Sequence, residues 1–270
     1  MKKILYILLI ASLLSGCEVI SEQNRYIEVT IPQTYSERVH VLVEFTGFRC
    51  VNCPKAAERA HELSQLYGEK LIVVAMHPKS NPFTNGASKY DYTCPEADVY
   101  YQYMGGTAQT AFPTGNIDFK KQENSYFSDY QEWPSMVAGE MRDTTDLHIA
   151  ITDVQADTAT REVSFSMSAY AGTAIHCQMA VWIIEDSIQG AQAMPDGTNN
   201  MEYYHRHVLR GVVGNEPWGE EIDVDTHQQT IHRTTTLPDT WDIKKCHLVA
   251  VCIDEKKQII NAAQAAINNQ

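Results

Sequence analysis

The chain has 270 residues, of which 44% are hydrophobic, and its 34 acidic and 21 basic side chains give a net charge of −13. This length exceeds that of a typical single domain and suggests two domains. The negative charge argues against a nucleic-acid partner, because such binding relies on cationic side chains that neutralise phosphates. The usual motifs of serine hydrolases, zinc proteases and phosphate-binding loops are missing from the sequence, which removes the ordinary support for those classes.

The beginning of the chain has the pattern of an export signal. Two lysines precede an apolar run over residues 4–14, which is too short to span a bilayer as a permanent helix. The letters L-S-G-C at positions 14–17 resemble the lipobox of bacterial lipoproteins, in which the cysteine is lipidated and becomes the first residue of the mature chain. We expect a signal peptide over residues 1–16, lipidation of Cys17 and a tether over residues 17–37. A plain secretory signal with an incidental cysteine is the alternative.

The predicted lipid anchor points to the cell envelope. Glu18 follows the cysteine in place of the aspartate that retains enterobacterial lipoproteins in the inner membrane, so the outer membrane is favoured. The pattern does not distinguish the periplasmic face of that membrane from its surface face. An acidic body suits attachment by acyl chains rather than by a basic patch.

A C-x-x-C motif formed by Cys50 and Cys53 lies between an apolar strand at residues 41–45 and an amphipathic helix that begins near Pro54. Unpaired N–H groups and the positive dipole end at a helix N-terminus stabilise a thiolate, which is the species that attacks disulfides. Arg49 adds a cation beside the first cysteine. We therefore predict thiol–disulfide exchange with polypeptide thiols or disulfides.

Structural zinc and an inert disulfide are weaker interpretations of the motif. A structural zinc site would need a second ligand pair at suitable spacing, and the sequence offers none. We accordingly expect no metal and no other cofactor. An inert disulfide between the two cysteines would close a very short loop and restrain little of the unfolded chain, but it remains the alternative.

The first half of the chain alternates strands and helices. Residues 39–45 and 71–76 read as buried strands, and apolar residues at helical spacing between them are followed by Gly68 as a stop. This spacing predicts a βαβ unit with a parallel strand pair. Further helices are expected around residues 95–104 and 132–142, and a linker at residues 143–146 marks a domain boundary.

The second half is dominated by period-two alternation. It offers seven predicted strands separated by turn signals, at residues 147–155, 161–170, 177–185, 203–213, 228–237, 246–254 and 258–263. This pattern predicts an all-β immunoglobulin-like sandwich over residues 146–270. Cys177, Cys246 and Cys252 fall on these strands, and we expect a bridge across the two sheets from Cys177 to one of the other two.

Residues 43–53 and the later Phe112-Pro113-Thr114 resemble the active-site segment and the cis-proline turn of thioredoxin-fold proteins. The resemblance implies an α/β thioredoxin-like domain over residues 38–143, with Cys50 as exposed nucleophile and Cys53 as resolving thiol. It also implies a cis bond before the proline. Residues that would contact a polypeptide substrate are Arg49, Phe112, Pro113 and Thr114. An ordinary trans turn is the alternative at the proline.

The same resemblance implies that Glu44 is a buried carboxyl group that accepts the proton of Cys53. Burial among apolar neighbours would raise its pKa and suit it to proton transfer near neutral pH. The alternative places Glu44 on the wet face of an edge strand. The motif departs from the usual thioredoxin pattern, since Arg49 replaces an aromatic residue and Cys94 lies in an insertion, where it is expected to pair with a motif cysteine or mark a lid.

Nearly the whole mature chain, including residues 204–210, the glycines around Trp218 and the strand near Cys246, resembles the Omp28 family of Bacteroides-type outer-membrane lipoproteins, which have been described as surface proteins or adhesins. The resemblance implies a rival function, in which the thioredoxin fold is a non-catalytic scaffold that binds a host or envelope protein. A carbohydrate- or protein-binding module on the sandwich loops is a third possibility. His205 and His207 share a face of one predicted strand, where a structural role is favoured over metal binding.

Overall fold

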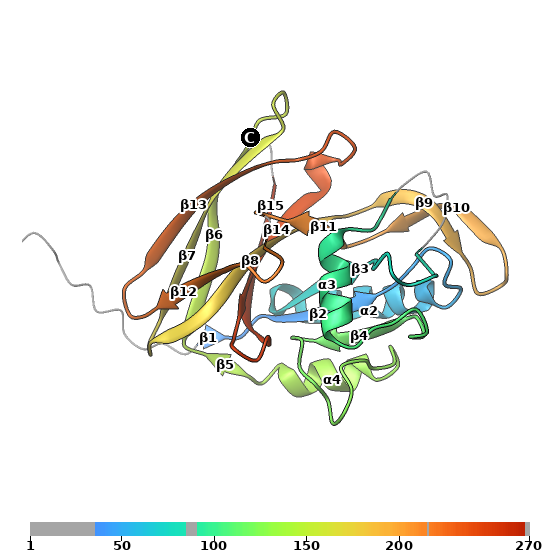
Figure 1. The fold of residues 1–270 in the computed structure, drawn as a ribbon, viewed down its shortest axis with the longest axis horizontal. Coiled ribbons are helices and arrows are strands. Elements are labelled where there is room, and N and C mark those ends of the chain that lie inside the picture. The colour runs from blue at the N-terminus through green and yellow to red at the C-terminus, as the bar shows by residue number, and fades with distance from the viewer. Residues whose placement is uncertain (1–35, 85–90, 215, 268–270) are drawn as a thin grey trace, which may run out of the picture. The chain divides into compact units, whose positions relative to one another are not determined.

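The computed structural model describes residues 36–84, 91–214 and 216–267. The predicted signal peptide, Cys17 and almost all of the predicted tether lie outside the described residues. The protein is mostly β-sheet, with mixed and antiparallel sheets and the helices α2, α3 and α4 (Figure 1). The described residues pack as one compact unit.

The expected βαβ unit is confirmed near the N-terminus. Strands β2 (His40–Phe45) and β3 (Leu71–Met76) are parallel neighbours, joined by α2 (Cys53–Tyr67) and the short 3₁₀ helix η2 (Gly68–Lys70). Pro54 fits in the first turn of α2, because a backbone N–H at that position would have no intrahelical acceptor and its loss therefore costs no hydrogen bond. Strand β4 (Thr114–Ile117) pairs antiparallel with the other side of β2, so β2 is an interior strand.

The helices cover both faces of this part of the sheet. The predicted helices are present as α3 (Pro95–Tyr103) and α4 (Trp133–Glu140). Apolar residues of α2 and α4 pack with Leu42, Val73 and Ile117 on one face. Tyr100 and Tyr101 of α3 pack with alternate residues of β2 and β3 on the other face. Because successive side chains of a strand point to opposite faces, the buried strands contribute to a hydrophobic core on each face of the sheet.

The second half builds two sheets that face each other. Strands β6 (Leu147–Ala156), β7 (Glu162–Ala171) and β13 (Gln229–Thr236) form a three-stranded antiparallel sheet. Opposite it lie β8 (Ile175–Glu185), β12 (Glu220–Val224), β14 (Cys246–Ile253) and β15 (Ile259–Ala266). A buried apolar cluster that includes Phe165, Val181 and Leu248 fills the space between them. The short pair β1 (Ser36–Glu37) and β5 (Thr144–Thr145) and the 3₁₀ helix η3 (Ile243–Lys245) complete the described fold.

One sheet runs through both halves of the chain. Strand β11 (Val208–Val212) pairs antiparallel with β8 and parallel with β3, which gives an eight-stranded sheet in the order β15-β14-β8-β11-β3-β2-β4 with β12 on β8. The Ala75 amide donates to the His207 carbonyl oxygen at 2.8 Å at this junction. The linker at residues 143–146 is therefore not a break in the sheet, because strands from both sides of it are hydrogen-bonded to each other.

The single strand predicted over residues 203–213 is wrong. The chain instead forms β10 (Asn199–His205), turns at His207 with a φ of 54°, and continues as β11. Strand β9 (Ile188–Ala193), which the pattern did not predict, pairs with β10 as a hairpin. His205 and His207 consequently do not share one face of a strand.

The expected bridge across the two sheets is also wrong. Cys177 lies on β8 and both Cys246 and Cys252 lie on β14, which are neighbouring strands of the same sheet. These three thiols and that of Cys94 are free and buried, so Cys94 is not paired with a motif cysteine either. The alternation correctly placed Cys246 and Cys252 on one face of the same strand, but it could not show which strands belong to the same sheet.

Candidate functional site

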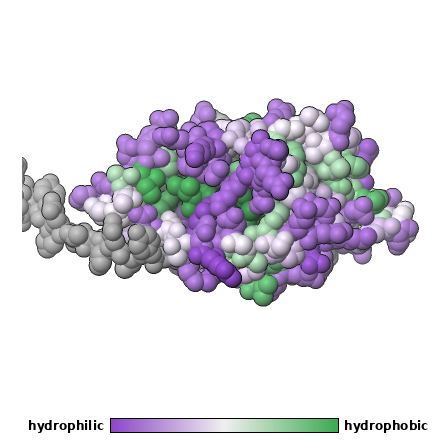
Figure 2. Space-filling view, turned by 90° about the horizontal axis from the view of Figure 1, so that it is seen from below, coloured by the Kyte–Doolittle hydropathy of each residue, from purple (hydrophilic) through white to green (hydrophobic). Residues whose placement is uncertain are grey.

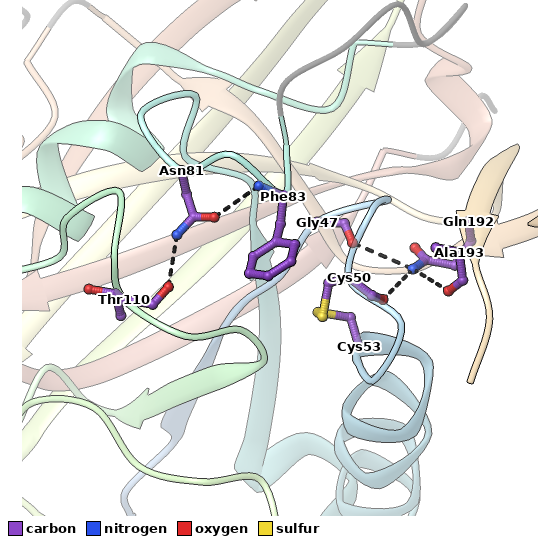
Figure 3. The surroundings of a disulfide bond; sticks show 8 residues. All are labelled: Gly47, Cys50, Cys53, Asn81, Phe83, Thr110, Gln192 and Ala193. Atoms are coloured by element: carbon purple, nitrogen blue, oxygen red, sulfur yellow. Dashed lines mark hydrogen bonds between the residues drawn. A yellow bond between two sulfur atoms is a disulfide. The ribbon is translucent and has the colours of Figure 1, made fainter. Parts of the chain in front are cut away.

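The C-x-x-C motif occupies the N-terminal end of α2, as predicted. Cys50 and Cys53 are joined by a disulfide with an S–S distance of 2.17 Å (Figure 3). The preceding turn is closed by the Cys50 amide, which donates to the Gly47 carbonyl oxygen at 3.0 Å. A Cβ atom at Gly47 would lie 2.5 Å from the Phe83 carbonyl oxygen, so only glycine fits this close approach.

The expectation of an exposed Cys50 is wrong, since both motif cysteines are only 2% exposed. The β9–β10 hairpin covers the motif loop. The Gln192 side-chain amide donates to the Cys50 carbonyl oxygen at 2.9 Å (Figure 3). The Ala193 backbone amide donates to the Phe48 carbonyl oxygen at 2.7 Å. A reacting thiol can therefore reach Cys50 freely only when this cover shifts.

The side chains around the motif loop are of two kinds. Arg49 is exposed, and its guanidinium lies 5.7 Å from the centre of the Phe48 ring. Val51, between the cysteines, is 45% exposed. The loop therefore presents a cation and an apolar side chain to solvent directly beside the buried disulfide.

The Phe112–Pro113 peptide bond is cis. Phe112 belongs to the same buried cluster as the two motif cysteines and stacks on Phe83 with ring centres 5.9 Å apart. Thr114 begins β4, and its hydroxyl donates to the Ser128 carbonyl oxygen at 3.1 Å. The structure thus brings Phe112 to the disulfide, whereas the hydroxyl of Thr114 already has a partner.

Glu44 is buried rather than on a wet edge, because β2 has a neighbour on each side. The residue is 2% exposed, and its Oε1 atom has no hydrogen-bond partner among the described residues. Burial raises the pKa of the carboxyl group to about 8, and a hydrogen bond with Thr46 only partly opposes this effect. Glu44 is therefore mostly protonated at neutral pH.

A small cavity of about 20 Å³ adjoins the disulfide. Its lining includes Glu44 and Cys53 from the first half of the chain and Gln192, Tyr203 and His205 from the β9–β10 hairpin. The hairpin therefore contributes polar groups to the site as well as covering it.

Two buried histidines also line this cavity. His77 follows directly after β3 and is 2% exposed, and His205 lies with its ring centre 6.1 Å from that of His77. Burial lowers the pKa of His205 to about 4. The pKa of His77 lies well below its usual value because of burial and, to a smaller extent, because His205 and Arg210 are near. Both imidazoles are neutral at physiological pH.

Sequence reasoning missed His77 and Gln192. A signal for His77 was available, because the carboxyl ends of parallel strands meet at one edge of a sheet, and both His77 and the C-x-x-C motif follow such ends. Gln192 offered no signal, since its role depends on a hairpin that the pattern did not predict.

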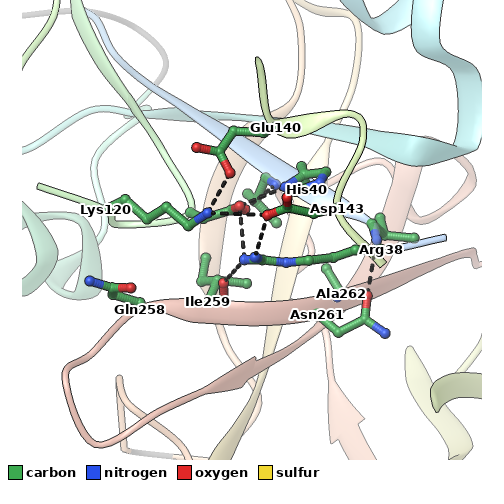
Figure 4. A network of polar contacts seen from close by, with 12 residues as sticks. Arg38, His40, Lys120, Glu140, Asp143, Gln258, Ile259, Asn261 and Ala262 are labelled. Carbon is green, nitrogen blue, oxygen red and sulfur yellow. Dashed lines mark hydrogen bonds and ion pairs between the residues drawn. The ribbon is translucent and has the colours of Figure 1, made fainter. Parts of the chain in front are cut away.

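A second polar cluster lies at the opposite end of β2 (Figure 4). His40, Asp118 and Glu140 are the one group of potential metal ligands found among the described residues. Arg38 pairs with Asp118 at 2.9 Å and Lys120 pairs with Glu140, so two cations already balance the carboxylates. This cluster is therefore an ion-pair network that joins the start of β2 to the segments around it.

Comparison with known proteins places the chain among outer membrane proteins. The pattern of the family described as outer membrane protein Omp28 matches residues 97–270. The chain belongs to the Omp28 family. A comparison with curated protein sequences gives no match.

The solved structures that resemble this fold include the following two. HBP35 of Porphyromonas gingivalis is 15% identical, with a TM-score of 0.65 over 86% of this chain and 76% of that one. Protein AGR_C_4864 from Agrobacterium tumefaciens is 14% identical, with a TM-score of 0.50 over 87% of this chain and 97% of that one. At these identities the likeness concerns the fold alone.

Surface features add little to the family assignment. On the face shown in Figure 2 hydrophilic residues predominate, and hydrophobic residues gather in one hollow. No helix within residues 36–84, 91–214 and 216–267 is long and apolar enough to cross a membrane.

Proposed function

We propose that this protein is a lipid-anchored envelope protein that carries out thiol–disulfide exchange on exported polypeptides. In this proposal residues 38–143 are a thioredoxin-like domain and residues 146–270 an immunoglobulin-like sandwich that shares its sheet. The observation that supports this proposal most strongly is the Cys50–Cys53 disulfide at a helix N-terminus, beside the buried and protonated carboxyl group of Glu44. Lipidation of Cys17 would hold the body at the outer membrane, on its periplasmic or its surface face.

The residues around the disulfide have defined roles in an exchange step. A substrate thiolate attacks the Sγ atom of Cys50, and the bond between Cys50 and Cys53 breaks as a mixed disulfide forms. Cys53 leaves as a thiolate and takes the proton of Glu44, which becomes a carboxylate. In the reverse direction Cys53 returns the proton to Glu44 and attacks the mixed disulfide, which releases the substrate thiolate.

Substrate contact is assigned to the rim of the motif. Arg49 and Val51 are the exposed side chains of the loop, and Phe112, Pro113 and Thr114 form the turn into β4. A cation and apolar side chains suit an extended polypeptide whose cysteine is flanked by apolar or acidic residues.

A trapping experiment tests this function. The Cys53→Ser protein should retain a mixed disulfide between Cys50 and a polypeptide partner in envelope extracts, because no resolving thiol remains. The Cys50→Ser protein is the matched control and should trap nothing. If neither variant forms an adduct and Cys50 fails to react with iodoacetamide after mild reduction, the proposal is wrong.

The burial of the disulfide under the β9–β10 hairpin favours a second candidate function. Both cysteines are 2% exposed and Gln192 holds the loop, which also suits a fixed structural disulfide in a scaffold that binds a host or envelope protein. A reduction potential below about −300 mV, measured against glutathione or dithiothreitol buffers, would support this rival, since inert structural disulfides have such values.

A further inference from the structure

His77 is an anomaly in the described core. Neither of its ring nitrogens makes a hydrogen bond of normal geometry with the described residues, although the Ala75 backbone lies close enough to raise its pKa slightly. Leaving a buried polar group unpaired costs stability, typically about 1–3 kcal/mol. Such groups are rare in native proteins, and a chemical role is one of the few reasons known for their presence.

Oε1 of Glu44 is another buried atom without a hydrogen-bond partner among the described residues, and Glu44 and His77 line the same cavity. The volume of about 20 Å³ is sufficient for a single water molecule, which needs roughly 10–15 Å³ of this kind of volume and two or more polar partners. A water at this position would meet a carboxyl group and an imidazole that otherwise lack partners.

The cavity also connects the core with the surface. Its inner wall includes Glu44 and His77, whereas its rim is formed by Tyr204, which is 53% exposed, and by the exposed Arg206. Cys53 borders the same space. The cavity therefore links Cys53 and Glu44 with the surface beside the β9–β10 hairpin.

A metal site suits the same residues less well. The candidate ligand atoms of Glu44, Cys53, His77 and His205 do not form a group within 4.8 Å, because the only such group among the described residues is the distant one at Asp118. These side chains are therefore better placed to be linked through a water molecule than to bind one metal ion together.

We propose that His77 is a positioning residue for proton transfer, which passes protons between Glu44 and solvent through this cavity. After Glu44 has given its proton to Cys53, a buried carboxylate remains and must be neutralised. The neutral imidazole accepts a proton from the rim side at one ring nitrogen and donates the other through the cavity water to Glu44. Glu44 is protonated again by a proton that solvent supplies, and the imidazole ends as its other neutral tautomer, which returns to the first by exchanging protons with solvent at the rim. This inference rests on the proposed exchange chemistry of Cys50 and Cys53.

The test uses the whole chain and a small reductant, so that it does not depend on a natural substrate. Reduction of the disulfide by dithiothreitol is followed from pH 5 to 9 by acid quenching, alkylation and mass spectrometry. His77→Leu removes the relay while satisfying the apolar surroundings. We expect it to unfold no more easily than the wild type, and to be reduced at least about tenfold more slowly, since positioned proton transfer contributes about 10²–10⁴-fold when it is direct.

The matched control is His207→Gln. His207 also has a buried ring nitrogen without a partner among the described residues, but it lies outside this cavity. Its rate should remain within about twofold of the wild type. A His77→Ala protein, whose shortened side chain leaves room for the ring, should be slow as well, and imidazole added to the buffer should accelerate it and leave the wild type unchanged.

The possible results separate this inference from the proposed function. A His77→Leu rate equal to the wild-type rate, or a slow His77→Ala rate that added imidazole does not raise, overturns the relay even if polypeptide adducts of Cys50 are found. A wild type that dithiothreitol reduces normally but that traps no polypeptide overturns only the proposed function. A disulfide that dithiothreitol cannot reduce overturns both.

Discussion

Strand β2 carries two buried polar residues, His40 and Glu44, that lie in different electrostatic surroundings. His40 at its start donates or accepts with Asp118 at 2.7 Å, and that carboxylate also pairs with Arg38 and accepts from the Val41 amide at 2.8 Å. Glu44, four residues on, keeps an unpaired oxygen and a pKa of about 8. The two residues are almost equally inaccessible to solvent, and each keeps one buried atom without a hydrogen-bond partner among the described residues, Nε2 of His40 and Oε1 of Glu44. The charge nearby distinguishes them, because His40 contacts a carboxylate that Arg38 balances, whereas Glu44 has no ion-pair partner among the described residues.

This contrast indicates where chemistry can be expected. The Asp118 carboxylate is satisfied by Arg38, His40 and the Val41 amide, whereas Glu44 and His77 are buried without an ion pair and keep unsatisfied polar atoms among the described residues. A group that is expensive to bury and poorly satisfied is a better candidate for function than one that completes a network. Substitutions at both ends of β2 and in its surroundings can test this distinction.

The largest effect is expected for Asp118→Asn. The change removes the charge that balances Arg38 inside the protein, and breaking a buried pair in this way costs about 3–5 kcal/mol. Asparagine tolerates the φ of 54° at this position, so the backbone is not an additional cause. Urea unfolding at pH 7 measures the loss. Asp143→Asn is the control, because its partly exposed pair with Arg38 at 3.5 Å should contribute at most about 1 kcal/mol.

Glu44→Gln should alter the pH dependence of stability. The pKa of Glu44 is about 8 in the folded protein and near 4.5 in the unfolded chain, so the folded state binds more protons between these values. The stabilisation is complete below pH 4.5 and is lost as the pH rises toward 8, by up to about 1.4 kcal/mol per pH unit. Between pH 5 and 7 the unfolding free energy of the wild type should therefore fall by up to about 3 kcal/mol relative to the variant.

Urea titrations at pH 5, 6 and 7 check this prediction. Glu62→Gln on the exposed face of α2 serves as control and should follow the wild-type profile. Parallel profiles for Glu44→Gln and the wild type would mean that Glu44 is ionised in the folded protein, and the contrast with Asp118 would then disappear.

A smaller effect is expected for Gln192→Ala. This change removes the donor to the Cys50 carbonyl oxygen, which should cost about 1–2 kcal/mol and make the disulfide more accessible. Reduction by dithiothreitol should become several-fold faster. Gln189→Ala, on the same strand but exposed, should change neither the stability nor the rate. Equal rates for the two variants would show that the hairpin does not limit access.

The smallest effect concerns the thiols of the sandwich. A hydrogen bond from Cys252 lowers the pKa of Cys177, whereas burial raises the pKa of Cys246 to about 12. Because the thiolate is the reactive form, Cys177 should be alkylated faster than Cys246 in the native protein near pH 8. Peptide mapping after timed exposure to iodoacetamide measures both rates in one sample. Faster labelling of Cys246 would show that access, not hydrogen bonding, governs these thiols.

Much of the fold was predictable because its signals are local. Continuous apolar runs marked β2 and β3, the apolar spacing after Pro54 marked α2, and the C-x-x-C motif identified the N-terminal end of that helix. Each of these features depends on residues within a few turns of one another. The close approach of the two motif cysteines followed from the same short spacing.

The remaining features depend on contacts between distant segments. The exposure of Cys50 was predicted wrongly because its cover, Gln192, lies 142 residues away. The assignment of Cys177 and Cys252 to one sheet depends on the register of β8 against β14, which periodicity does not determine. The burial of Glu44 likewise follows from the placement of β4 beside β2.

The insertion of β11 beside β3 has a consequence for how the chain can be divided. A fragment that ended at residue 143 would lack β11, and the row of backbone groups on that side of β3 would face water. An apolar six-residue strand with a bare edge is a template for pairing with other chains. Such a fragment should associate or precipitate when it is produced alone, and the same would apply to any proteolytic clip that released the C-terminal strands.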